Sequence, residues 1–563
     1  MSIPRQLAAP TTLRTTRTTL LAPAFNKRTL VLFLALAAIT FVLRIPTFFE
    51  PAWHDDEGTF AAVAQKLLGG GELYADAWES KPPLFLYAYA GIFKLLGAGI
   101  LQLRVAAAVA ALASTLGLFV LARQLTSERQ ALIACLVLTL FLAVPFWDGN
   151  LASAELFSLS LTILGVLAVV RYARIPISSP ANRASAFGDN GGGWVWLVGA
   201  GLMFGLAALI RQTAALPMVA AVAWLALSGR DFLRPAMLMA LGGVLAVVPV
   251  VAAFAALGSF HWFWDANVGF FISYLSTARE VGVSGRSLML LPFLVTVAAI
   301  YWYRSRSKTP RWGLPALWLT IMLAGALVTG RPYEHYLIPV FPPLALLVAI
   351  TAPHIRLTWR PTRGQAPAFA IVASVALLWV TVLVPEFDGD PLAIRYSKDE
   401  HYYYQFAGRV LGTTSEEEYN DYFDERVERV KDISATLDTL GARGQSVYVF
   451  GEYSWVYALS GTEPAWRYTS SFNILQIQGL AEDLEGVLTR ARPAFIVVMD
   501  DSWPRHPDPD GIMRQRFDRA LQGLDRLLGR DYEPVASVER AHIYRLVSDR
   551  SAARPVPDPV ISQ

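Results

Sequence analysis

The stretches "TLVLFLALAAITFVL" (residues 29–43) and "PAWHDDEGTF" (residues 51–60) together decide the fold of this chain. The first is an uncharged apolar run, and the second places His54 beside three carboxylates. An α-helix needs about 20 apolar residues to cross a hydrocarbon core of about 30 Å. Similar runs recur along the 563 residues, of which 54% are hydrophobic and 17% charged, against roughly 25% charged in soluble proteins. The sequence therefore predicts a polytopic α-helical membrane protein.

Eleven apolar segments are predicted to cross the membrane. They lie near 29–48, 102–123, 130–146, 152–171, 194–210, 212–228, 234–257, 287–303, 312–329, 335–351 and 367–385. One set of alternate loops holds fourteen Arg and Lys residues, and the other short loops hold only four. By the positive-inside rule, the basic N-terminus is predicted to be cytoplasmic and the acidic stretch to lie outside. The lipid bilayer is an expected partner, and nucleic acid is not.

Four regions are predicted along the chain. They are a basic cytoplasmic tail (1–28), a membrane domain (29–385) with a long first outer loop (49–101), an α/β domain outside the membrane (386–550) and a disordered tail (551–563). The chain holds one cysteine, Cys135, which excludes an intrachain disulfide.

The α/β domain is predicted from a change of composition at about residue 386. "QSVYVFG" and "PAFIVVMDD" are patterns of buried strands, and "YEPVASVERAHIYRLV" alternates as a hairpin around Glu539 and Arg540. A charged helix is predicted over 414–440, with Ser415 as its N-cap and Glu418 completing a capping box.

The acidic stretch begins a second predicted helix, "EGTFAAVAQKLL", whose apolar residues have helical spacing. This helix is expected to rest on the membrane surface. Carboxylates at its N-terminus are stabilised by free N–H groups and by the helix dipole, so helix capping is one interpretation. A cap needs one carboxylate, however, and Asp55, Asp56 and Glu57 supply three. A functional site is the other interpretation.

Further polar residues are predicted at the same outer level of the membrane. They are Lys81, Arg104, Asn150, Glu155, Arg211, Arg331, Tyr333, Glu334, His335 and Tyr336. Ionisable groups at this depth indicate a functional site. Cations beside carboxylates at a membrane face suit a lipid with a phosphate headgroup, because arginine binds phosphate bidentately and lysine supplies a point charge. Lys81 has an alternative interpretation, in which its side chain only reaches the membrane surface by snorkelling. For His335 the alternative is a structural hydrogen bond.

The succession of outer motifs resembles a known family. "DDEGTFAAVAQKLLGGGELYADAW", "ESKPPLFLYAYAGIFKLLG" and "LRVAAAVAALAS" follow one another, and "GLAALIRQTAALP" and "GRPYEHYLIPVFPPLALL" come later. Together they resemble the GT-C glycosyltransferases of the protein O-mannosyltransferase and aminoarabinose-transferase type (glycosyltransferase family 39 and relatives). The C-terminal pattern resembles a bacterial branch of that superfamily, which implies a bacterial plasma membrane.

The resemblance implies sugar transfer, with inversion, from a polyprenyl-phosphate donor to an acceptor outside the membrane. Asp56 and Glu57 match the family's catalytic pair, with Asp56 as general base. The resemblance places Lys81 at the donor phosphate. Arg104, Arg211, Arg331, Tyr333, His335 and Glu155 are the further candidates for binding the phosphate or the sugar.

Some alternatives stay open. Asp55 is the alternative base, and a divalent metal at Asp55 and Asp56 is possible but not favoured. The sugar, and whether the acceptor is a protein, a lipid or a glycan, are not predicted. Four C-terminal aromatics, Trp455, Tyr457, Trp466 and Tyr468, fit a domain core better than sugar stacking. A transporter or a non-catalytic membrane protein with an outer sensing domain is the alternative function.

Overall fold

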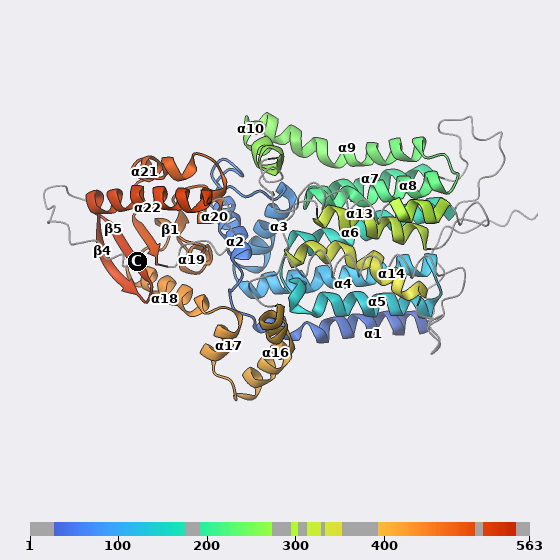
Figure 1. Ribbon diagram of the computed structural model, residues 1–563, viewed down its shortest axis with the longest axis horizontal. Helices are drawn as coiled ribbons and strands as arrows, with labels where there is room; N and C mark the ends of the chain where they lie inside the picture. Colours follow the sequence, from blue (N-terminus) through green and yellow to red (C-terminus); the bar gives the residue numbers. More distant parts are fainter. Residues whose placement is uncertain are drawn as a thin grey trace, which may run out of the picture.

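The computed structural model describes residues 27–174, 192–272, 294–301, 312–327, 333–351, 392–500 and 511–547. A bundle of long helices occupies one end of the molecule and a sheet with its helices the other, with a thin middle layer between them (Figure 1).

The bundle consists of helices that run along the long axis of the molecule (Figure 1). They are α1 (Lys27–Leu43), α4 (Ile100–Leu125), α5 (Glu128–Ala143), α6 (Ala154–Arg174), α7 (Gly193–Ala208), α8 (Leu216–Leu227), α9 (Leu233–Ala256), α13 (Gly313–Leu327) and α14 (Phe341–Thr351). Short segments join or extend them: η1 (Ile45–Phe49), η2 (Pro145–Trp147), η4 (Gln212–Ala215), α10 (Phe260–Trp264), the π-helix η5 (Asp265–Gly269) and η6 (Glu334–Val340).

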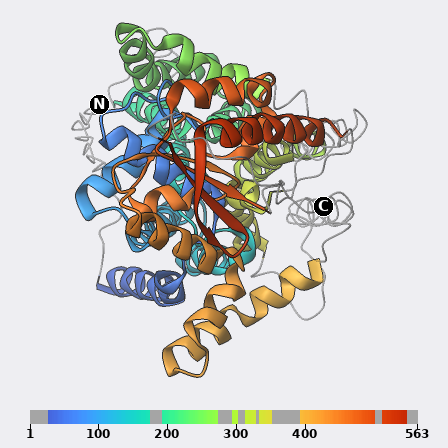
Figure 2. The same ribbon diagram turned by 90° about the vertical axis from the view of Figure 1, so that its left-hand side faces the viewer.

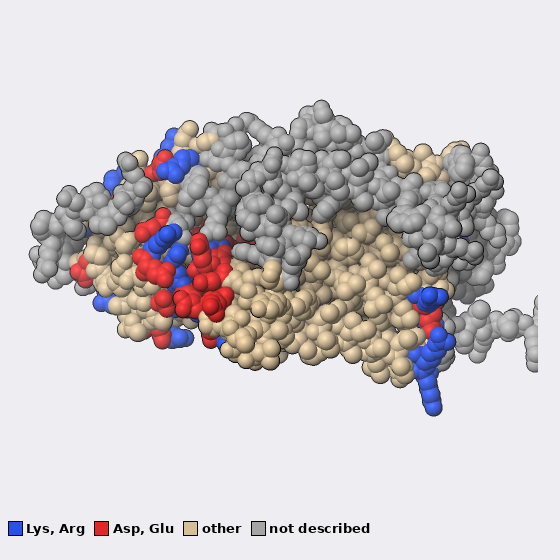
Figure 3. Space-filling model, turned by 60° about the horizontal axis from the view of Figure 1, so that its bottom comes forward, with Lys and Arg blue, Asp and Glu red and all other residues tan. Residues whose placement is uncertain are grey.

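Among the described residues, five helical segments are long and apolar enough to cross a membrane. They are Lys27–Phe49, Ile100–Leu125, Ala154–Ala173, Leu233–Ala256 and Glu334–Thr351, and shorter apolar helices pack beside them. The bundle surface that Figure 3 shows among the described residues is uncharged, whereas charged residues gather over the C-terminal part on the left and at the far end of the bundle on the right. The chain is therefore an integral membrane protein.

Several predictions fall outside the described residues. They concern residues 1–26 of the tail predicted at 1–28, the tail at 551–563, the span at 367–385, most of the span at 287–303, and Arg331. The last two residues of the predicted N-terminal tail, Lys27 and Arg28, belong to helix α1 instead. The count of eleven spans and the sidedness of the chain therefore stay predictions.

The middle layer consists of α2 (Asp55–Leu68) and α3 (Pro83–Leu96), which both belong to the first outer loop. The helix predicted from "EGTFAAVAQKLL" is confirmed as α2. The prediction that its apolar face lies on the membrane surface is wrong for most of that face. Phe60, Val63 and Ala64 are at most 4% exposed, because α3 packs on one side and α19 (Trp455–Ser460) on the other.

The C-terminal part contains a five-stranded sheet of order β2-β1-β3-β5-β4. Its strands are β1 (Ser446–Phe450), β2 (Glu463–Pro464), β3 (Phe495–Met499), β4 (Tyr532–Val538) and β5 (Ala541–Leu546). The first three pair in parallel, and β5 is antiparallel to both β3 and β4. The predicted hairpin is therefore confirmed, with Glu539 in the left-handed region at φ 43°.

Helices cover both faces of this sheet (Figures 1 and 2). They are α18 (Arg426–Thr439), α19, α20 (Ser471–Gln476), α21 (Leu480–Ala491) and α22 (Ile512–Asp531), and α16 (Leu392–Leu411) and α17 (Glu416–Phe423) lie beside the junction with the bundle. The capping box of Ser415 and Glu418 is confirmed. The single helix predicted over 414–440 is wrong, because the chain is extended at Asp424 between α17 and α18.

Candidate active site

A small cavity, open to solvent on one side, lies where the middle layer meets the bundle. It is lined by His54, Asp56, Glu57, Phe60, Lys81, Asp148, Leu151, Ser153, Ala154, Glu155 and His335. These residues come from the first turn of α2, the segment before α3, the turn from η2 to α6, and η6. Two helix N-termini, of α2 and α6, therefore open onto one cavity.

Asp56 is the cavity acid with no recorded hydrogen bond or ion pair to any described residue. Burial raises the pKa of its carboxyl, but Lys81, His54 and His335 outweigh burial, so the pKa is lowered overall. The residue stays accessible to solvent, so the neighbouring groups crowd the carboxylate without covering it. Asp56 is therefore an ionised carboxylate that can accept a proton from a ligand in the cavity.

Glu57 belongs to the cavity wall but is already bonded. Its Oε1 accepts from Arg104 at 2.5 Å and from the backbone N–H of Ala152 at 2.8 Å. Arg104 is fully buried and also pairs with Glu50 at 3.2 Å. This carboxylate therefore joins α2 to α4 and to the turn before α6.

Lys81 lies directly before Pro82 and Pro83, which fix the backbone dihedral φ. The hydroxyl of Tyr74 donates to the Lys81 carbonyl at 2.9 Å, and the Lys81 ammonium lies 5.8 Å from the centre of the Phe60 ring. Lys81 makes no salt bridge to a described residue, and its charge acts on the carboxyls of Asp56 and Glu79. The ammonium group is therefore held in place and is available to an anion.

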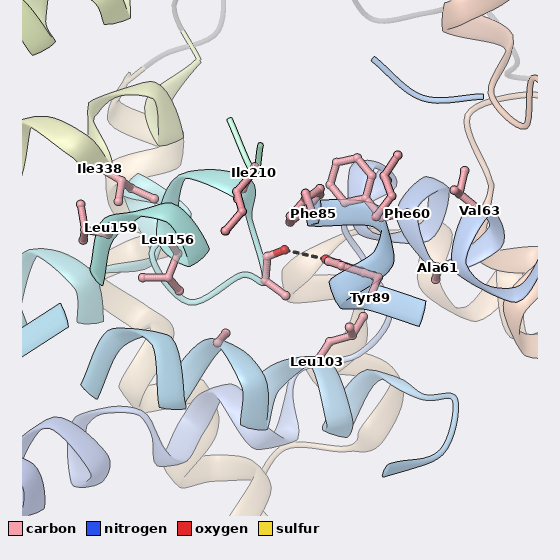
Figure 4. Close-up of a cluster of buried hydrophobic side chains, with 14 of the residues drawn as sticks. Phe60, Ala61, Val63, Phe85, Tyr89, Leu103, Leu156, Leu159, Ile210 and Ile338 are labelled. Carbon is pink, nitrogen blue, oxygen red and sulfur yellow. Dashed lines mark hydrogen bonds between the residues drawn. The ribbon is translucent and has the colours of Figure 1, made fainter. Parts of the chain in front are cut away.

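An apolar wall supports this arrangement. Phe60, Phe85 and Tyr89 meet edge to face, with ring centres 4.9 to 5.5 Å apart. The hydroxyl of Tyr89 donates to the carbonyl of Ala152 at 2.6 Å, as the dashed line in Figure 4 shows. The wall thus fixes α3 against the same turn before α6 that Glu57 contacts.

His335 closes the opposite side of the cavity. Its Nδ1 lies 3.2 Å from an Asp148 carboxylate oxygen and its Nε2 lies 3.8 Å from Glu155. Glu155 also pairs with Arg211, whose guanidinium lies 4.6 Å from the centre of the Tyr336 ring. The spans α6, η6 and the α7–α8 connection are therefore tied together by charges at the cavity.

Asp55 points away from the cavity. Its carboxylate pairs with Arg426 of α18 at 3.0 Å. Burial raises the pKa of Asp55 to about 6, although Arg426 and His54 oppose the rise. Asp55 and Asp56 therefore have different surroundings, although they are adjacent in the chain. Within the described part of the chain, no group of three His, Cys, Asp or Glu is arranged to hold a metal ion.

The structure brings five predicted site residues to the cavity: Asp56, Glu57, Lys81, Glu155 and His335. Arg104 lies behind Glu57, and Arg211 lies behind Glu155. Tyr333 stacks on His335 at 5.7 Å. Asp56 and Lys81 therefore line the same cavity, while Arg331 lies outside the described residues.

Sequence reasoning missed several supporting residues. Asp148 adopts φ 53° in the segment "WDGN", and this turn-forming segment after an apolar run is the signal that could have identified it. Glu50 accepts from Tyr402 at 2.5 Å and from Asn150 at 2.8 Å. Tyr402 is 352 positions from Glu50 along the chain, so no local pattern could have paired them.

Comparisons with known proteins agree with this architecture. Residues 80–254 match the family described as dolichyl-phosphate-mannose-protein mannosyltransferase. No curated protein matches the chain in sequence. ArnT from Cupriavidus metallidurans bound to undecaprenyl phosphate has a TM-score of 0.55 at 17% identity, over 95% of this chain and 100% of that chain. Its apo state gives 0.56 at 17% identity, over 92% of this chain and 98% of that chain.

At such identities the likeness to ArnT shows the fold, while the family match covers the segment from Ser80 to the end of α9. The resemblance to the protein O-mannosyltransferases, predicted from the outer motifs, is confirmed over residues 80–254 by the family match, and the likeness to ArnT is one of fold.

Proposed function

We propose that the chain transfers a sugar from a polyprenyl-phosphate donor to an acceptor outside the membrane, with inversion at the anomeric carbon. One observation carries the proposal. An ionised Asp56 without a partner among the described residues shares a cavity with Lys81, at the end of an apolar helix bundle. The N-terminus of α1 then lies in the cytoplasm, and the sheet of the C-terminal part lies outside.

Asp56 acts as the general base. It removes the proton from a hydroxyl or amine of the acceptor, and the acceptor atom attacks the anomeric carbon opposite the phosphate. The bond from that carbon to the phosphate oxygen breaks, and its electron pair stays on the departing polyprenyl phosphate. The proton remains on Asp56, so the charges balance. General-base catalysis of this kind contributes about 10²- to 10⁴-fold to a rate.

Lys81 stabilises the charge that develops on the leaving phosphate. An ammonium group lowers the barrier when it lies where negative charge grows during the reaction, and fixed positions cost no reorganisation. The Pro-Pro pair, the Tyr74 hydrogen bond and the Phe60 ring supply that fixed position. We assign Arg331 to the same phosphate from the sequence, and His335 and Tyr333 to the sugar from their place beside the cavity.

The cavity also fits a lipid-linked donor better than a carried solute. Transporter sites lie near the bilayer midplane, whereas this cavity lies at the ends of the bundle helices beside the middle layer. ArnT, which has this fold, is bound to undecaprenyl phosphate in its solved structure. A polyprenyl phosphate is therefore the donor carrier that we propose for this chain as well.

The test uses the lipid-linked sugar that accumulates in cells lacking the protein. This lipid is extracted and given to purified full-length protein with membranes of the same cells as acceptor. We expect release of polyprenyl phosphate and a product of opposite anomeric configuration by NMR. Asp56→Asn should lower the rate by at least about 100-fold while undecaprenyl phosphate still binds. Full activity of Asp56→Asn would remove Asp56 as the base.

A further inference from the structure

The C-terminal part of the chain holds the first turn of α2 at two points. The indole N–H of Trp455 donates to the carbonyl of His54 at 2.9 Å. The guanidinium of Arg426 pairs with the Asp55 carboxylate at 3.0 Å. His54 and Asp55 are the two residues directly before Asp56. The backbone that carries the proposed base is therefore fixed from outside the membrane bundle.

Arg426 is itself rigidly held. Its Nε and Nη2 donate to the two carboxylate oxygens of Asp424 at 2.8 and 2.7 Å. Its guanidinium lies 5.3 Å from the centre of the Tyr453 ring, and the Tyr453 hydroxyl accepts from Arg429 at 2.9 Å. A planar guanidinium held by the Asp424 carboxylate and the Tyr453 ring presents its remaining donors to Asp55 in a fixed orientation. The break between α17 and α18 at Asp424 creates this geometry.

Helix α2 also packs against α19 without a gap. A Cβ at Gly58 would lie 2.7 Å from the backbone nitrogen of Trp455, so this position admits only glycine at the present distance. Next to it, the Thr59 hydroxyl donates to Ser454 at 3.0 Å. The first turns of α2 therefore have little freedom to move relative to the C-terminal part.

We propose that Arg426 and Trp455 are positioning residues that turn Asp56 toward the cavity by holding the two residues before it. Successive side chains of an α-helix point about 100° apart, so fixing Asp55 toward Arg426 also fixes the direction of Asp56. Asp55 is then the anchor and Asp56 the base. This inference rests on the proposed function, and it gives the C-terminal part a role in catalysis as well as in any binding of the acceptor.

A double-mutant cycle tests the pair. The variants are Asp55→Asn, Arg426→Gln and the combination, in the full-length protein with the extracted lipid-linked sugar as donor. Each single change should lower kcat by about 10- to 100-fold, the cost typical of a base displaced by about 1 Å, with KM changed less than about twofold. Because both changes break one contact, the combination should be no worse than the more severe single variant. If the loss of kcat in the combined variant equals the product of the two single losses, the two residues act independently and the proposal is overturned.

A second pair of variants separates positioning from folding. Trp455→Phe removes the hydrogen bond to His54 but keeps a ring against Gly58, and should lower kcat without a change in KM. Arg426→Lys keeps a cation and should recover part of the Arg426→Gln loss. A role in folding alone would instead lower the amount of folded protein and leave the kcat of the folded fraction unchanged, which would contradict the inference.

Glu463→Gln is the matched control. Lys66 and Glu463 pair at 3.1 Å and also join α2 to the C-terminal part, but at the far end of α2. We expect wild-type kcat from this variant. Asp56→Asn tests the proposed function itself, because it removes the proposed base. If Asp56→Asn is inactive while Asp55→Asn and Arg426→Gln keep full kcat, the positioning role fails and the base survives. If Asp55→Asn is as inactive as Asp56→Asn and Arg426→Gln is active, Asp55 is the base.

Discussion

Two helices of this chain begin with three carboxylates in their first turn, and the molecule uses them in opposite ways. At α17 these are Glu416, Glu417 and Glu418, and all three are exposed. Glu418 forms the capping box, and Glu416 pairs with surface cations at 3.0 and 3.2 Å. At α2 the three carboxylates diverge, because Asp55 pairs with one part of the chain, Glu57 is buried against another, and Asp56 faces a cavity.

The comparison shows that an acidic helix N-terminus does not by itself indicate a functional site. Both turns satisfy the same rule, since carboxylates near free N–H groups and the positive end of the dipole are favourable. The difference comes from the surroundings. Solvent screens the α17 acids, whereas at α2 burial and fixed cations assign each acid a separate role. The predictions below compare matched residues at the two turns.

The largest difference is expected for the middle acid of each turn. Asp56→Asn should reduce sugar transfer by at least about 100-fold because it removes the base. Glu417→Gln, the middle acid of α17, should leave the transfer rate unchanged. The measurement is release of polyprenyl phosphate by equal amounts of folded protein. Equal losses in the two variants would mean that net charge, and not a base, supports the reaction.

The second largest difference is expected between the lysines near the two turns, Lys81 and Lys431. Lys431 already pairs with Glu416 at 3.2 Å and with Glu428 at 3.0 Å, whereas Lys81 faces the cavity. Lys81→Gln should weaken binding of undecaprenyl phosphate by about 10- to 100-fold, the value of a hydrogen bond to a charged group. Lys431→Gln should bind it normally. Titration of both purified variants with undecaprenyl phosphate measures this, and unchanged binding by Lys81→Gln would exclude Lys81 from the phosphate site.

The buried acid of α2 should matter most for stability. Glu57→Gln leaves the buried Arg104 with a weakened pairing, and removing one partner of a buried ion pair costs about 3 kcal/mol or more. Glu416→Gln at α17 breaks contacts of an acid whose side chain is 62% exposed, and should cost less than about 1 kcal/mol. Unfolding of the two variants in detergent, compared with wild type, measures the difference. Similar losses would show that Arg104 does not depend on Glu57.

Local patterns predicted the elements of this molecule, and distant contacts decided their roles. The α2 helix, the Ser415 capping box and the hairpin at Glu539 each depend on residues within a few positions, and all three were predicted. The pairing of Asp55 with Arg426 spans most of the chain. The sequence therefore predicted a site at the acidic stretch but left open which aspartate is the base.

The four aromatics of the C-terminal part illustrate the same limit. Trp455, Tyr457 and Tyr468 are at most 4% exposed, so the preference for core packing over sugar stacking is confirmed for these three. The contact of Trp455 with His54 spans 401 positions. No pattern around Trp455 indicates that its indole nitrogen reaches the helix that carries the proposed base.

The two aspartates of α2 should respond to pH in different ways. The folded-state pKa of Asp55 is raised to about 6 by burial, against an ordinary value of 3.8. Its ionised form therefore costs stability above pH 6, and this cost disappears as the pH falls toward 4. As the pH falls from 8 to 5, the free energy of unfolding of wild type should therefore rise relative to that of Asp55→Asn.

Asp56 supplies the contrast in the same experiment. Its pKa is lowered, with Lys81, His54 and His335 outweighing burial, so its stabilising contribution is complete above pH 3.8 and is lost only below that. The difference in free energy of unfolding between wild type and Asp56→Asn should stay constant from pH 8 to pH 5. Denaturant unfolding of the two variants and wild type at each pH measures this. An equal pH dependence of the free energy of unfolding in the two variants would contradict the environments described for Asp55 and Asp56.

The smallest effect is expected at the cap of α17. The Ser415 hydroxyl accepts from the Glu418 N–H at 3.1 Å, and Glu418 accepts from the Ser415 N–H at 2.9 Å. Ser415→Ala should cost about 1 kcal/mol of stability and leave kcat unchanged, because the loss is confined to a surface turn. The N-cap of α2, His54, makes no such side-chain hydrogen bond, so its turn depends on Trp455 and Arg426 instead. A fall in kcat for Ser415→Ala would show that α17 transmits its position through Asp424 to Arg426, and that the two acidic turns are not independent.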